Sequence, residues 1–374
     1  MGMKKRIYVV LAIVLALLPL LSGCADRELI DADPTAAPEA VTGDAEILQD
    51  EPDAYDHKAN RYIFQTAKQN GGSFSQAGDT IYYVSQGVLY AYDTQNHTAA
   101  PLYTDEHLSG VYASGGGVFF LTDNGGDLQK NYEFDLFELL PAGDFRHVFS
   151  SLAFPRDEYG ELEDKNADIP PRTVQANDAY VLVACHAETY LVRRDSGEIV
   201  SKDYNNFNTY VVDGSGGFYF TDPKGAQSIW KLDPESSEYS LCRGDGIGRR
   251  DKPDGAIRYE YVYSIDGALY ASTRVPSAVW KLNDGGGDLC VFKPENDDRI
   301  LDFLVLPGKD CVYVVYAADN TALNIYKIST ANNEILAYEL VPAKELRGGK
   351  MAIVDDSVYY MNGDTPESRA LFQN

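Results

Sequence analysis

The sequence lacks the short motifs that usually carry catalysis or cofactor binding. It has no His-Glu-x-x-His pair, no glycine-rich phosphate loop with its lysine, no Gly-x-Ser-x-Gly nucleophile turn and no calcium-loop spacing. Its five histidines lie far apart in the sequence, so a metal site would need several of them to converge. We therefore expect no cofactor and no metal ion, and the sequence identifies no catalytic residue.

Basic residues are scarce as well. The chain of 374 residues carries 57 Asp and Glu against 32 Lys and Arg, which gives a formal net charge of −25. This charge repels polyanions at long range and argues against nucleic acid as a partner. The sequence also has no helical periodicity, which argues against a helical solenoid.

The apolar run at the N-terminus is too short to cross a membrane as a helix. It covers residues 7–20, which is 14 residues, whereas a spanning helix needs about 20. The run follows Lys4, Lys5 and Arg6 and ends just before Cys24. This layout is typical of a signal peptide.

Residues 21–24, Leu-Ser-Gly-Cys, resemble the lipobox of bacterial lipoprotein precursors. The resemblance implies cleavage before Cys24 and lipidation of its thiol, and several acyl chains on one residue anchor a protein stably. We therefore expect residues 1–23 to be a lipoprotein signal peptide and the protein to be extracytoplasmic, anchored to the cell membrane. An ordinary secretory signal followed by an unrelated cysteine is the alternative.

The next segment, residues 24–60, has the composition of a disordered acidic tether. Residues 25–60 contain 11 Asp or Glu against Arg27 and Lys58, with little aliphatic content. Such a segment cannot bury enough apolar surface to offset its chain entropy. We expect it to act as a solvated spacer without a partner of its own.

A short element of apolar and aromatic residues recurs seven times along the rest of the chain. Its clearest copy is Ser-Ile-Trp-Lys-Leu-Asp at residues 228–233. The intervals between copies run from 40 to 53 residues, which is the period of a four-stranded propeller blade. The aromatic markers of the copies are Tyr90, Phe137, Tyr190, Trp230, Trp280, Tyr326 and Phe372.

Residues 61–374 are therefore predicted to form an all-β propeller. Seven four-stranded blades of about 45 residues are favoured, while six or eight remain possible. A second strand precedes each copy, usually after a polar or glycine turn such as 177–178 or 216–217, as a tight hairpin requires. The sequence stops after a third strand of the last unit, and the strand-like residues 61–66 would supply the missing outer strand and close the ring.

Two of the predicted second strands resemble the Tyr-Trp-Thr-Asp element of the low-density lipoprotein receptor propeller. They are Phe-Phe-Leu-Thr-Asp at residues 119–123 and Phe-Tyr-Phe-Thr-Asp at residues 218–222. On this basis residues 61–374 are similar to the propeller of a largely uncharacterised group of bacterial lipoproteins. The resemblance implies the fold but lends no catalytic residue, and receptor-type propellers have six blades where seven units are counted here.

The predicted connections are longer on one face of the ring than on the other. Residues 123–133, 152–172 and 243–258 join second to third strands or successive units; we call their side the long-loop face and the opposite side the short-turn face. Long loops on a rigid scaffold commonly bind ligands. The best local indication of a binding site is a group of basic residues in this acidic protein. The group consists of Arg243, Arg249, Arg250, Lys252 and Arg258.

The favoured function is a non-enzymatic, lipid-anchored cell-surface propeller that binds a protein or polysaccharide ligand through the long-loop face. The basic group could instead pair with neighbouring carboxylates and form only a solvated loop. The alternatives are a glycosidase or lyase acting on envelope or dietary polysaccharide through two carboxylates, and a structural subunit of a membrane-associated complex. The ligand-binding candidates are Tyr159, Arg249, Arg250, Arg274 and Tyr316.

Four cysteines remain besides Cys24, and each falls in a different unit: Cys185, Cys242, Cys290 and Cys311. Cys242 and Cys290 are predicted on the outermost strands of neighbouring blades, where the splay of the sheets holds them beyond disulfide reach. We expect free, mostly buried thiols.

Overall fold

The structure is a computed structural model, and the part of the chain that it describes is almost entirely β-strand. The described residues are 71–114, 116–125, 133–153, 171–185, 188–204, 210–222, 227–247, 256–274, 276–294, 303–317, 322–342 and 350–373. All of them belong to the compact unit 53–374, which is distinct from residues 1–52. Within these ranges no helix is long and apolar enough to cross a membrane.

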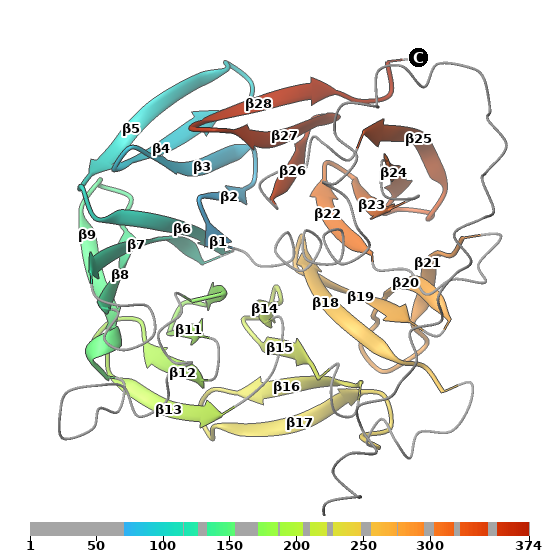
Figure 1. The fold of residues 1–374 in the computed structure, drawn as a ribbon. Coiled ribbons are helices and arrows are strands. Elements are labelled where there is room, and N and C mark those ends of the chain that lie inside the picture. The colour runs from blue at the N-terminus through green and yellow to red at the C-terminus, as the bar shows by residue number, and fades with distance from the viewer. Residues whose placement is uncertain are drawn as a thin grey trace, which may run out of the picture. The chain divides into compact units, whose positions relative to one another are not determined.

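Seven antiparallel sheets follow one another around a ring (Figure 1), so the predicted β-propeller with seven blades is confirmed. The first strands of blades one to seven are β2 (Phe74–Ala77), β6 (Leu108–Ser114), β10 (Thr173–Ala176), β14 (Tyr210–Val212), β18 (Tyr259–Ile265), β22 (Leu304–Gly308) and β26 (Met351–Val354). The second strands are β3 (Thr80–Ser85), β7 (Gly117–Gly125), β11 (Tyr180–Ala184), β15 (Phe218–Thr221), β19 (Ala268–Arg274), β23 (Cys311–Ala317) and β27 (Ser357–Asn362).

The outer half of each blade is formed by its third and fourth strands. The third strands are β4 (Val88–Asp93), β8 (Glu133–Leu139), β12 (Glu188–Arg193), β16 (Ile229–Asp233), β20 (Ser277–Lys281), β24 (Ala322–Ser329) and β28 (Thr365–Ala370). The fourth strands are β5 (Thr98–Thr104), β9 (Phe145–Ser150), β13 (Ile199–Tyr204), β17 (Glu238–Arg243), β21 (Leu289–Phe292) and β25 (Ile335–Pro342). A 3₁₀ turn, η2 (Ser151–Ala153), follows β9.

Burial falls from the inner to the outer strands of each blade. Every residue of β11 and of β26 is buried, whereas β5 and β25 are mostly exposed. Strands that are buried on both faces carry continuous Val, Leu, Ile and Tyr, because both faces contact neighbouring blades. This pattern explains why inner strands such as β11 and β26 are almost wholly apolar.

Apolar clusters join each blade to the next. One cluster contains residues of blades two and three, another joins blades three and four, and a third joins blades four and five. The ring closes through a cluster in which Phe74 and Ile81 of blade one pack with Val354 and Tyr359 of blade seven. The hydroxyl of Tyr359 also donates a hydrogen bond to the carbonyl of Thr94, at 3.4 Å.

The described residues give blade seven three strands, β26, β27 and β28. The predicted closing strand, residues 61–66, lies outside the described residues. Just after it in the sequence, the short strand β1 (Gly71–Gly72) pairs with the inner edge of β6 of blade two. Gly71 allows this approach, since a Cβ there would overlap the ring of Tyr112.

One predicted strand was wrong. The seventh copy of the repeat was assigned to residues 371–374, but the third strand of blade seven is β28, which ends at Ala370. A tight turn at Gly363, whose φ is 62°, starts β28 early, so Leu371 and Phe372 follow the strand. Leu371 is buried, and the ring of Phe372 stacks at 6.5 Å on that of Tyr313 in blade six.

Candidate functional site

A cavity of about 830 Å³ opens on the short-turn face of blades three, four and five. Its walls are turns that join first to second strands, together with the turn between the third and fourth strands of blade four. The polar residues that line it include Asn177, Tyr180, Asp213, Ser215, Lys231 and Glu235. The cavity is therefore a product of the ring, because no single blade supplies more than part of it.

Asn177 fixes the blade-three wall of the cavity. Its side-chain oxygen accepts hydrogen bonds from the backbone N–H groups of Ala179 at 2.9 Å and Tyr180 at 2.7 Å. Its amide nitrogen donates to the carbonyl of Gly216 in blade four, at 2.8 Å. Asn is favoured in turns for this kind of local bonding, and here it also holds two blades together.

Asp213 fixes the blade-four wall. Its Oδ1 accepts hydrogen bonds from the N–H of Ser215 at 3.0 Å, from the Ser215 hydroxyl at 2.7 Å and from the N–H of Gly217 at 2.8 Å. Opposite it, the hydroxyl of Tyr180 donates to Oε1 of Glu235 at 2.7 Å, which ties blade three to blade four. These walls are thus ordered before any ligand arrives.

Two glycines let the turns of blades four and five meet beside the cavity. The N–H of Gly214 donates to the carbonyl of Gly267 at 3.1 Å. A Cβ added at Gly214 would lie 2.9 Å from the Cα of Gly267, closer than a real side chain is found. Gly267 also has a φ of 76°, a value that favours glycine.

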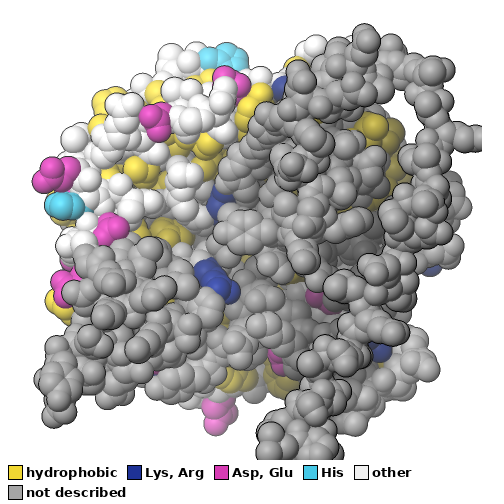
Figure 2. All heavy atoms as spheres, in the orientation of Figure 1, with side chains coloured by type: hydrophobic (Ala, Val, Ile, Leu, Met, Phe, Trp, Pro, Cys, Tyr) yellow, Lys and Arg dark blue, Asp and Glu magenta, His cyan; other side chains and the backbone are white. Residues whose placement is uncertain are grey.

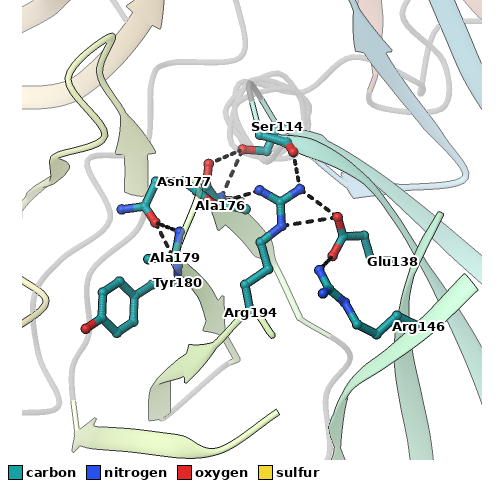
Figure 3. Close-up of polar contacts among 9 residues, drawn as sticks. Ser114, Glu138, Arg146, Ala176, Asn177, Ala179, Tyr180 and Arg194 are labelled. Carbon is teal, nitrogen blue, oxygen red and sulfur yellow. Dashed lines mark hydrogen bonds and ion pairs between the residues drawn. The ribbon is translucent and has the colours of Figure 1, made fainter. Parts of the chain in front are cut away.

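A buried ionic network borders the same cavity on its blade-two side (Figure 3). Arg194, which follows β12 of blade three, donates to Oε1 of Glu138 in blade two at 2.6 Å from Nη2 and 3.1 Å from Nε. It also donates to the carbonyl of Asn177 at 2.7 Å and to that of Gly116. Arg146 of β9 donates to the second oxygen of Glu138 at 2.5 Å.

This network sets the charge state of Glu138. Burial alone would raise the pKa of this carboxyl group, but the hydrogen bonds from Arg194 and Arg146 outweigh it and lower the pKa. The carboxylate is therefore ionised and fully engaged, which suits a structural clamp between blades two and three. A second cavity, of about 390 Å³ between blades one and two, lies on the other side of the clamp, and both cavities share Gly116.

Three of the predicted ligand-binding residues, Tyr159, Arg249 and Arg250, lie outside the described residues, as does the predicted lipidation site Cys24. Arg274 is the last residue of β19, where its backbone pairs with Ser277. The placement of a site on the long-loop face therefore stays a prediction.

Tyr316 is the one predicted binding residue whose side chain is described. It lies near the end of β23, in a strand rather than in a loop, and it is half-buried. Its ring packs against Phe303 at 5.6 Å, Phe292 at 5.9 Å and Tyr326 at 6.0 Å. These contacts hold the ring in the packing between blades five and six.

Arg243 of the predicted basic group is neutralised by a carboxylate. That carboxylate belongs to the next blade, whereas neighbouring carboxylates in the sequence were expected. Nε of Arg243 lies 2.9 Å from Oδ2 of Asp288 in blade five, and both side chains are largely buried. The hydrogen bond to Asp288 raises the pKa of Arg243 further above its already high usual value. This residue therefore joins two blades, as Arg194 does, and is engaged rather than free for a ligand.

The four cysteines in the described residues are free, as predicted, but only two of them are buried, where most were expected to be. Cys185 and Cys311 are buried, Cys242 is half-buried and Cys290 is exposed. Burial raises the pKa of the Cys311 thiol and that of Cys242. In the described ranges no three His, Cys, Asp or Glu side chains are arranged to hold a metal ion.

Acidic side chains stand apart from one another on the part of the surface that Figure 2 colours. They are spread singly over the rim of blades one and two, at the upper left of the view. The cavity of blades three to five differs, because it gathers several carboxylates in one concave site. Sequence reasoning missed this site because its residues lie in short turns, although the Asn177 and Gly216 turns were themselves predicted.

The fold and the cavity define the protein as a seven-bladed β-propeller with a polar cavity on its short-turn face. No protein-family model and no curated protein matches the sequence. Among solved structures, the chain is similar to virginiamycin B lyase from Staphylococcus aureus with quinupristin, at 11% identity over 81% of this chain and 96% of that chain, with a TM-score of 0.48.

Two further structures give similar values. The β-propeller domain of Swd1 from Myceliophteria thermophila matches at 11% identity over 80% of this chain and 99% of that chain, with a TM-score of 0.47. BamB from Moraxella catarrhalis matches at 13% identity over 79% of this chain and 94% of that chain, with a TM-score of 0.41. At these identities the likeness concerns the fold alone, and no function follows from it.

Proposed function

We propose that this protein is a lipid-anchored β-propeller on the cell surface that binds a protein or polysaccharide ligand and performs no chemistry on it. The observation that carries the binding function is the cavity of about 830 Å³ on the short-turn face. Concave sites with a few fixed polar groups are where proteins usually bind ligands. The capped turns of Asn177 and Asp213 supply such groups in a rigid setting.

The anchor rests on the sequence. The charged start, the short apolar run and the Leu-Ser-Gly-Cys segment ending at Cys24 support export followed by lipidation. The resemblance to bacterial lipoproteins with a receptor-type propeller supports the same location. Both quoted copies of the receptor-type element belong to second strands, β7 and β15, but the ring has seven sheets instead of six.

The glycosidase alternative is less well supported. Its general acid would need a carboxyl group whose pKa is raised by its surroundings. In the cavity, the backbone N–H of Glu235 bonds to Asp233 and lowers the pKa of that carboxyl group. This direction favours an ionised Asp233, which suits binding better than acid catalysis.

A ligand screen tests the proposed function. The lipidated protein in detergent would be presented with envelope proteins and with glycans, and binding would be measured as a function of concentration. We expect at least one saturable ligand that heat-denatured protein does not bind. Binding that requires the long-loop face should weaken in the double variant Arg249→Ala/Arg250→Ala in a salt-sensitive way, because exposed charges are screened by salt. The absence of any saturable ligand would contradict the proposal.

A further inference from the structure

The cavity on the short-turn face carries a strong excess of negative charge. Four carboxylates line it, and Lys231 is the basic side chain of the lining. None of the four carboxylates forms an ion pair, within 4 Å, with a described Lys, Arg or His side chain. They are Asp178, Asp213, Asp233 and Glu235.

A comparison between blades explains why Lys231 forms no close ion pair with any of these four carboxylates. In blade six, Lys327 lies opposite Tyr313 in the neighbouring strand and pairs with Asp356, in the next blade's turn, at 2.7 Å. In blade four, Lys231 lies opposite Tyr219 in the same way. The corresponding turn of the next blade carries Gly267 in place of the aspartate, and both turn residues have positive φ.

Lys231 consequently lies over an aromatic ring. Its Nζ is 5.4 Å from the centroid of the Tyr219 ring, a cation–π distance. Gly217 leaves the space that this arrangement needs, since a Cβ there would lie 3.1 Å from Cε of Lys231 and 3.0 Å from Cε2 of Tyr219. The cation thus lies over the ring and forms no close ion pair with the carboxylates, although its charge contributes to the lowered pKa of Asp233.

The described residues of the lining offer no platform for a sugar ring. Carbohydrate and other flat ligands are usually held by an exposed aromatic face. Tyr180 is the aromatic residue of the lining, but it is only 2% exposed, and the Arg193 guanidinium lies over its ring at 5.6 Å. A ligand with positive charges on flexible side chains fits this lining better than a glycan does.

We propose that the cavity binds a polypeptide segment rich in lysine or arginine, held by the carboxylates of Asp178, Asp213 and Glu235. This inference rests on the proposed binding function and names the class of its ligand. The net charge of −25 on the whole chain would assist the approach of such a segment from solution. Because hydrogen bonds already hold the turns in place, the carboxylates need little rearrangement to receive the segment.

Fluorescence anisotropy with a labelled peptide of alternating lysine and glycine tests the inference on the full lipidated chain at low salt. The double variant Asp178→Asn/Glu235→Gln should bind about threefold to tenfold more weakly, because each partly exposed charge pair contributes modestly. The substitution Lys231→Met should have the opposite effect and tighten binding about twofold to fivefold, since it removes the repelling charge found among the described lining residues. Added salt should shrink both differences.

The control is a double variant with the same change in net charge, Glu106→Gln/Glu334→Gln. Both glutamates are exposed, Glu106 between β5 and β6 of blades one and two and Glu334 before β25 of blade six. It should alter binding by less than about twofold. Melting temperatures of all variants should match that of the wild type, which shows that the cavity persists.

Three outcomes overturn the inference. The double cavity variant could bind no more weakly than the control variant, Lys231→Met could weaken binding, or a neutral glycan could compete for the site with the lysine peptide. The second outcome would indicate an anion site at Lys231, and the third a polysaccharide site. If the ligand screen still yields saturable binding that these variants leave unchanged, only the inference fails; if the screen yields none, the proposed function fails as well.

Discussion

At the scale of single residues, the buried ion pairs between blades join side chains whose pairing cannot be predicted from the sequence. Glu138 and Arg194 are 56 positions apart in the chain, yet they form the clamp between blades two and three. Asp288 and Arg243 repeat the arrangement between blades four and five. A repeat pattern predicts that these positions lie in or beside outer strands, but the partner depends on how neighbouring blades are rotated.

The substitution Glu138→Gln tests the clamp. The Glu138 side chain is only 4% exposed, so the variant leaves Arg194 and Arg146 partly buried without their counter-charge. We expect the free energy of unfolding to fall by about 3 kcal/mol, the usual cost of breaking a buried ion pair. Urea denaturation measures it, and the exposed-site variant Glu334→Gln should match the wild type. An equal loss in both variants would contradict the clamp.

The same pair predicts a pH dependence. The pKa of Glu138 in the folded protein lies below its ordinary value of about 4.5, so its stabilising effect is complete above that pH. As the pH falls through the lowered pKa, the carboxylate takes up a proton and the stabilisation is lost. The difference in unfolding free energy between wild type and Glu138→Gln should therefore be constant above about pH 5 and shrink below about pH 4.5. A difference that persists down to pH 3 would exclude the ionised pair as its cause.

At the scale of elements, the third strands were the easiest to predict. β4 contains the predicted marker Tyr90, and β16 begins one residue after the predicted start at 228. Alternating aromatic and aliphatic residues predict a strand well where a clear glycine, Asn or Asp turn precedes them. The strand predicted at residues 371–374 was wrong for a different reason. Leu371 and Phe372 are apolar because they pack against blade six, so they resemble a strand in the sequence, but they follow β28 in the structure.

The arrangement of the turns around the cavity could not be predicted from the sequence. Their glycine, Asn and Asp residues predict hairpins, but not that four neighbouring hairpins enclose a cavity. The closeness of Gly214 to Gly267 is likewise a property of two blades. The candidate site therefore became visible only when the ring was assembled.

Gly214→Ala tests this contact between turns. The added methyl group would lie 2.9 Å from the Cα of Gly267, so the two turns must separate. Overpacking of this kind usually costs about 1–3 kcal/mol. Thermal melting should show a lower midpoint for Gly214→Ala than for Lys309→Ala, an exposed turn residue of blade six. Equal midpoints would mean that the turns are not held in contact.

At the scale of the whole molecule, stability comes from apolar clusters that each link adjacent blades, including blades seven and one. In the described residues the outermost strand of blade seven is β28, which is mostly exposed. An unpaired edge is a liability that closed rings avoid. This is the reason for expecting a further strand from residues 61–66.

Two deletions of equal length test this closure. Removing residues 61–66 should lower the melting temperature more than removing residues 36–41 of the acidic tether, because only the first leaves the edge of blade seven unpaired. Differential scanning calorimetry on the two variants measures the difference. The same melting temperature in both would remove the case for an N-terminal closing strand.

We propose that the binding propeller is held at the cell surface by a lipid on Cys24, and the most direct test is where the protein partitions and what its N-terminus carries. Detergent phase separation combined with mass spectrometry of the N-terminal peptide would be applied to the wild type and to Cys24→Ser. We expect the wild type to begin at an acylated Cys24 and to enter the detergent phase, and Cys24→Ser to be unacylated and released to the aqueous phase. An unmodified Cys24, or equal partitioning of the two proteins, would contradict it.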